Sequence, residues 1–128
     1  MTVRLPIAIA LVFALAAGAA AQTPGISASI LVQSSPLAGF RYYDAKALWD
    51  EMKVGDTLAL VREPDNPHDA NAVRVEWRGH KLGYVPRREN ADVARQIDRG
   101  TPVRARISRL ETSRSPSKRI EFEVFVDL

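Results

Sequence analysis

Short strand-like segments, separated by turn-forming residues, constrain the fold of this chain more than any other feature of its sequence. Val73, Val75 and Trp77 alternate with charged residues, and Arg78–Gly79 then reverses the chain. Apolar side chains at every second position lie on one face of a strand, so this pattern predicts a half-buried strand and a tight hairpin. Similar segments recur along the chain, which predicts a mainly β domain.

The remaining segments predict how the sheet is completed. Further strands are expected at residues 29–33, 39–43, 57–62, 80–86, 103–108 and 120–126. Asp44 and Asn90 are expected to cap two short helices, the second of which ends at Gly100. Many short strands favour a closed or nearly closed barrel, because closure removes exposed edges. We therefore expect a small OB-like β-barrel of about six strands with two short helices, and Trp49 and Trp77 in its core.

The N-terminus has the layout of a secretory signal peptide. Arg4 precedes an apolar run over residues 5–17, and Ala19 and Ala21 form an A-x-A cleavage site. A transmembrane anchor is the competing interpretation, but the strongly apolar run is about a dozen residues, short of the roughly 20 that cross a bilayer. We expect a signal peptide at 1–21, a linker with a candidate first strand at 22–36, and the binding domain at 37–128. This predicts an exported protein, periplasmic or secreted, with no membrane segment after cleavage.

Composition excludes several kinds of chemistry. The chain has no cysteine, which rules out thiol catalysis and cysteine-based zinc sites. Without Arg4, 17 basic residues face 15 acidic ones, an imbalance too weak to indicate a nucleic-acid partner by itself. No serine lies in a G-x-S-x-G context and no glycine-rich phosphate loop is present. His68, Asp69 and Glu63 are the nearest approach to a metal site, but adjacent positions on a tight loop rarely converge on one ion. We expect no catalytic residue, cofactor or metal.

Three segments carry a resemblance to a known family. They are GFRYY at 39–43, LVREPDNPHDANAVRV at 60–75 and KLGYVPRRENADVA at 81–94. Together they resemble the HIRAN domain, and the loop sequence E-P-x-N-P-x-D-x-N-A-V is the most specific part of the match. The resemblance implies an OB-like module that captures the 3′-hydroxyl end of single-stranded DNA.

The resemblance also implies which residues contact the DNA. The positions concerned are Arg41, Tyr42, His68, Asp69, Tyr84 and Arg87. The first two would face the terminal nucleotide, His68 and Asp69 would contact the end, and Asp69 would accept a hydrogen bond from the 3′-hydroxyl. Tyr84 would face a second base and Arg87 a phosphate. Two positions depart from the family pattern, with His68 where a tyrosine is common and Tyr84 where a histidine is found.

The same residues have other interpretations when the family is set aside. A fixed carboxylate can distinguish a terminal hydroxyl, which donates, from a phosphodiester oxygen, which cannot. However, an aspartate in a loop rich in Asn and Pro more often caps its own backbone, so Asp69 could form only an Asx-turn. Tyr42 and Tyr84 could be barrel aromatics with hydroxyls at the rim. Arg41, Arg87 and the neighbouring Arg88 could be solvated charges, as could the Arg104, Arg106 and Arg109 stripe.

Three functions are consistent with these patterns. The first is a non-catalytic module that binds single-stranded DNA with a free 3′-hydroxyl end. The second is an envelope binding or assembly module with the same fold and a different ligand or a protein partner, which the predicted signal peptide favours. A hydrolase that depends on His68 ranks last.

Overall fold

One antiparallel sheet of six strands makes up most of the protein. The structure, a computed structural model, describes residues 28–128, so the signal peptide predicted at 1–21 lies outside the described residues. The strands follow the sheet order β1-β6-β5-β2-β3-β4. They are β1 (Ser29–Pro36), β2 (Thr57–Arg62), β3 (Val73–Trp77), β4 (His80–Tyr84), β5 (Val103–Leu110) and β6 (Ile120–Asp127). The predicted mainly β class and the hairpin between β3 and β4 are confirmed.

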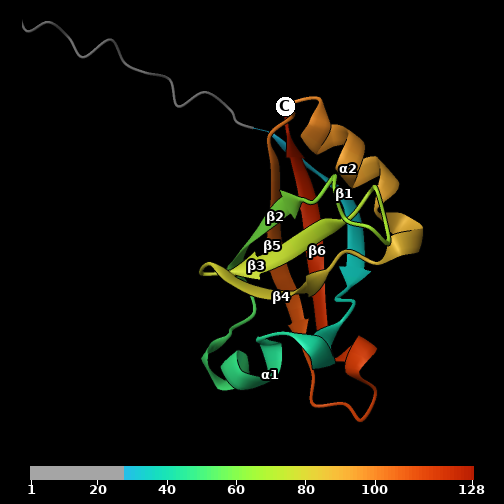
Figure 1. The fold of residues 1–128 in the computed structure, drawn as a ribbon. Coiled ribbons are helices and arrows are strands. Elements are labelled where there is room, and N and C mark those ends of the chain that lie inside the picture. The colour runs from blue at the N-terminus through green and yellow to red at the C-terminus, as the bar shows by residue number, and fades with distance from the viewer. Residues whose placement is uncertain (1–27) are drawn as a thin grey trace, which may run out of the picture.

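Short helical elements lie at the two ends of the sheet. They are η1 (Phe40–Tyr42), α1 (Ala45–Leu48), η2 (Trp49–Glu51), η3 (Arg87–Glu89), α2 (Ala91–Asp98) and η4 (Pro116–Lys118), where η marks a 3₁₀ turn. Figure 1 shows α1 at one end of the sheet, near the orange-red turn that leads into β6, and α2 at the other end. None of the helices between residues 28 and 128 is long and apolar enough to cross a membrane.

A single residue pair brings the two edges of the sheet together. The N–H of Ala38, just after β1, donates to the carbonyl of Tyr84 at 2.9 Å, and the N–H of Tyr84 donates back to Ala38 at 2.9 Å. Gly83 makes this approach possible, because a Cβ at this position would overlap the Ala38 carbonyl oxygen. The sheet is therefore an open ladder of six strands that is joined into a barrel-like shape at one point.

The core follows the predicted alternation. Val73, Val75 and Trp77 on β3 are at most 3% exposed, and Phe122 and Val124 on β6 are fully buried. The intervening side chains face outward, as the period of two requires. Trp49 is only partly buried, and its ring packs edge-on against that of Phe40 with centroids 5.8 Å apart.

The predicted strand at residues 39–43 is wrong. Gly39 has φ +82°, a left-handed conformation that ends the extended chain after Ala38, and residues 40–42 form the 3₁₀ turn η1. The aromatic side chains suggested a strand, but only one of the residues of η1, Phe40, is buried and anchors the turn. Phe40 is 3% exposed and fixes η1 to the core.

The predicted helix caps are correct in position but not in mechanism. Asp44 precedes α1 and Asn90 precedes α2, yet neither side chain accepts a hydrogen bond from its helix. Asp44 lies 3.6 Å from the His80 imidazole, and the Asn90 amide is used elsewhere, as described below. The first expected helix is a single turn, Ala45–Leu48, and the chain continues directly into the 3₁₀ turn η2.

Candidate nucleic-acid interface

The turn η1 presents Arg41 and Tyr42 to solvent. Both side chains are exposed, and Tyr42 is 79% exposed, which is unusual for an aromatic residue in a rigid turn. The turn is held by the N–H of Tyr42, which donates to the Gly39 carbonyl at 3.0 Å, and by the buried Phe40. An aromatic ring and a guanidinium are thus carried by neighbouring residues of a turn whose backbone is anchored to the core.

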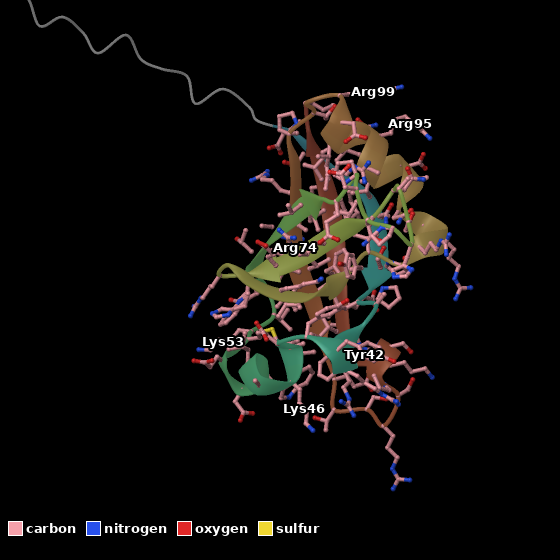
Figure 2. The ribbon with its side chains drawn as sticks, in the orientation of Figure 1. Tyr42, Lys46, Lys53, Arg74, Arg95 and Arg99 are labelled. Atoms are coloured by element: carbon pink, nitrogen blue, oxygen red, sulfur yellow. The ribbon has the colours of Figure 1, made fainter. Side chains whose placement is uncertain are left out.

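A second segment, η4, lines a hollow beside this turn. Pro116 and Ser117 of η4 line a hollow of about 260 Å³ together with residues 37–42. In Figure 2, Tyr42 lies next to the chain that carries η4. The structure thus places Pro116 and Ser117 beside Arg41 and Tyr42, the residues predicted to face the terminal nucleotide.

Tyr84 belongs to a polar network rather than to an open aromatic surface. Its hydroxyl donates to Glu63 Oε1 at 2.8 Å and accepts a hydrogen bond from Lys81 Nζ at 2.7 Å. The Tyr84 ring packs edge-on against the Tyr43 ring, with centroids 5.7 Å apart. Lys81 Nζ lies 4.1 Å from the centroid of the Tyr43 ring and 4.5 Å from that of the Tyr84 ring. This network connects β4 to the residue that follows Tyr42.

Glu63 is the centre of that network. Besides Tyr84, its carboxylate accepts hydrogen bonds from Asn66 Nδ2 at 3.0 Å and from Arg74 at 2.9 Å. Burial tends to raise the pKa of Glu63, but these hydrogen bonds and the charge of Lys81 hold its pKa below the usual value. Burial and the hydrogen bond to Glu63 raise the pKa of Tyr84, so the phenol keeps its proton.

Two Asx-turns shape the loop between β2 and β3. Asn66 Oδ1 accepts the His68 N–H and Asp69 Oδ1 accepts the Asn71 N–H, each at 2.9 Å. The structure therefore confirms that Asp69 caps its own loop. Its second oxygen, Oδ2, accepts a hydrogen bond from the amide of Asn90 at 2.7 Å, and Asn90 is only 2% exposed. The carboxylate is fixed in orientation, while His68 next to it is exposed.

The six predicted residues fall into two groups joined by this loop. Arg41 and Tyr42 lie next to Tyr43, which packs on Tyr84, and Tyr84 holds the start of the loop through Glu63. His68 and Asp69 lie at its far end, where Asp69 contacts Asn90, three residues after the exposed Arg87. Within residues 28–128, no hydrogen bond or ion pair joins Asp69 to Arg41, Tyr42 or Tyr84.

The arginine stripe of β5 is a paired solvent-facing surface. Arg104 contacts Asp127 at 2.7 Å, Arg106 contacts Glu123 at 3.2 Å and Arg109 contacts Glu111 at 2.7 Å. Exposed pairs of this kind contribute little to stability, but they leave Arg104 and Arg106 less available to a phosphate. Among residues 28–128 there is also no group of three His, Cys, Asp or Glu side chains that could hold a metal ion.

The sequence did not indicate Lys81 and Tyr43 as parts of the candidate site, and it suggested Glu63 only as a weak candidate metal ligand. Strict alternation along β4 would place Lys81 and Tyr84 on opposite faces, because they are three residues apart. The pairing of β3 with β4 shifts register between Val75 and Glu76, and this irregularity lets both side chains reach one another. A glycine next to Tyr84 was the available signal, since glycine within a strand often marks such a site.

Comparison with known proteins settles the family. The model of the HIRAN domain matches residues 30–128, which includes all six strands except the first residue of β1. The chain belongs to the HIRAN domain family. HIRAN domains are known as nucleic-acid-binding modules.

Individual relatives agree with this assignment. A crystal structure of a Lactobacillus plantarum protein has a TM-score of 0.68 and 28% identity, and the match covers 79% of this chain and 97% of that one. The crystal structure of the HIRAN domain of human HLTF has a TM-score of 0.52 at 21% identity over 77% of each chain, which shows a shared fold. The helicase-like transcription factor of Mus musculus is 38% identical over 63 residues, which is 48% of this chain and 6% of that protein. The match thus spans a small part of the length of this curated relative.

Proposed function

We propose that this HIRAN domain is a non-catalytic module that binds single-stranded DNA with a free 3′-hydroxyl end. The observation that carries the proposal is the exposed pair Arg41 and Tyr42, fixed on η1 beside the hollow formed with Pro116 and Ser117. Stacking of a base on an aromatic ring contributes about 1–3 kcal/mol, and an arginine beside it can pair with the adjoining phosphate.

The carboxylate of Asp69 supports recognition of the 3′ end of a strand rather than of an internal nucleotide. Two hydrogen bonds fix its carboxylate, and each oxygen has a second lone pair available. A 3′-hydroxyl can donate to such an oxygen, whereas a 3′-phosphate would be repelled by it. The fixed orientation also reduces the entropy that is lost on binding.

Fluorescence anisotropy with short labelled oligonucleotides tests the proposal. We expect tighter binding of a 3′-hydroxyl strand than of the same strand with a 3′-phosphate, and a loss of about 1–3 kcal/mol in Tyr42→Ala, which is roughly 5- to 150-fold in affinity. Arg41→Ala is compared with Arg99→Ala, since Arg99 lies at the opposite end of the molecule (Figure 2). Equal affinity for the two strands refutes recognition of the end, and equal loss in both arginine variants refutes the site.

The place of action is part of the proposal. We propose that residues 1–21 direct export and that the mature module begins at Gln22. Mass spectrometry of the protein recovered from a periplasmic or culture fraction tests this, and an intact Met1 there contradicts it. A wild-type protein that binds no oligonucleotide, but co-purifies with one envelope protein at a fixed ratio, supports an assembly module instead.

A further inference from the structure

A second, larger hollow adjoins the Tyr42 hollow at η4. It has a volume of about 610 Å³ and shares Ser117 with the smaller one. The charged residues that line it are Arg88, Arg109, Glu111, Lys118 and Glu121. The two hollows therefore adjoin at Ser117.

The net positive charge of the domain is concentrated around η1 and η4. Three adjoining hollows surround these turns, since the first two share Phe40 and the second and third share Ser117. Together they are lined by six basic and three acidic residues, a surface that we call the basic belt. The rest of residues 28–128 holds 11 basic and 12 acidic residues, so the belt accounts for the whole positive excess.

The basic side chains of the belt differ in whether they form ion pairs or hydrogen bonds. Within the described part of the chain, Arg88 and Lys118 have no acidic partner within ion-pair distance, whereas Arg109 is paired with Glu111. On the other side of Tyr42, the Arg119 guanidinium donates to the Ser113 carbonyl at 2.7 Å and lies over the Phe40 ring. Within residues 28–128, the larger hollow therefore has two cations with neither an acidic partner nor a side-chain hydrogen bond, while each of the other two hollows has one, Lys46 and Arg41.

We propose that the larger hollow holds the sugar-phosphate backbone of the strand whose end is bound at η1. The strand leaves the Tyr42 hollow past Ser117, and the phosphates on its 5′ side lie between Arg88 on η3 and Lys118 on η4. This inference rests on the proposed function and deepens it. It assigns a second, sequence-independent subsite whose ligand is the phosphodiester backbone.

Oligonucleotide length separates this subsite from the end-binding site. The test uses the full chain, a dinucleotide and a ten-nucleotide strand, both with free 3′-hydroxyls, and the double variant Arg88→Gln with Lys118→Gln. The matched control is Arg95→Gln with Arg99→Gln, which removes the same charge at the far end of the molecule (Figure 2).

The salt dependence of binding provides the readout. Each phosphate contact to a single strand contributes about 0.7 to the slope of log affinity against log salt. We expect the double variant to lower the slope for the ten-nucleotide strand by about 1.4. The affinity of the double variant for this strand, relative to that of the wild type, would then be reduced about sevenfold more at 50 mM than at 200 mM salt. The dinucleotide should bind the variant and the wild type alike.

The other possible results of this experiment distinguish failure of the backbone subsite from failure of the proposed function. An unchanged slope for the long strand, or an equal loss for both lengths, overturns the backbone subsite while leaving end binding in place. An equal effect of the control variant shows only a general effect of charge and also overturns it. If the wild type binds neither strand, the proposed function itself fails.

Discussion

Replacement of Gly83 by alanine tests whether the single contact between the sheet edges holds the site together. An ideal Cβ at Gly83 would overlap the carbonyl oxygen of Ala38 and lie 3.1 Å from the Leu37 side chain. The backbone of Ala38 must therefore move, and its two hydrogen bonds with Tyr84 must break. Loss of two such bonds costs about 2 kcal/mol, and overpacking adds about 1–3 kcal/mol.

The expected net effect is a loss of about 3 kcal/mol in the free energy of unfolding, since alanine also restricts the unfolded chain by about 0.4–1 kcal/mol. Urea unfolding measures this loss. Gly79→Ala is the matched control, because its Cβ meets nothing within 4 Å and only its φ of +80° is unfavourable, which costs about 1–2 kcal/mol. If Gly83→Ala is no more destabilising than Gly79→Ala, the contact between the edges does not contribute to stability.

Two further predictions concern the loop that joins the two halves of the site. Asp69→Ala should lower the free energy of unfolding by about 1–3 kcal/mol, because the buried Asn90 amide loses its acceptor. Chemical denaturation measures this loss, and an unchanged free energy of unfolding would contradict the hydrogen bond between Asp69 and Asn90. Glu63→Gln should be less stable than wild type at neutral pH. Because the folded-state pKa of Glu63 is depressed, that difference should shrink as the pH falls below its usual value of 4.5. Unfolding curves measured between pH 7 and pH 3 test the sign, and a difference that grows towards acid would refute it.

Much of the fold could be predicted because it depends on local patterns. The alternation of Val73, Val75 and Trp77 and the Arg78–Gly79 turn define the β3–β4 hairpin whatever surrounds it. The segment around Tyr42 was predicted wrongly because its aromatic composition resembles that of a strand, while its conformation depends on Gly39 and on burial of Phe40 in the core. Tertiary contacts overrode local propensity there.

The candidate site was harder to predict because its geometry depends on contacts between distant segments. The resemblance selected Tyr84, but the pairing of its hydroxyl with Glu63 spans 21 residues and requires the irregular β3–β4 register. Conversely, the Asx-turn at Asp69 was predictable, because it involves an N–H only two residues away. The role of η4 could not be read from the sequence, since no local pattern brings Ser117 beside Tyr42.

The closure at Ala38 and Tyr84 uses backbone atoms and the missing side chain of Gly83. The side chains that η1 displays therefore take no part in joining the barrel. If Arg41 and Tyr42 bind DNA as proposed, substitutions at these positions should alter binding without disturbing the framework that supports them. The turn would then be a suitable position for engineering altered binding, because stability depends on other atoms.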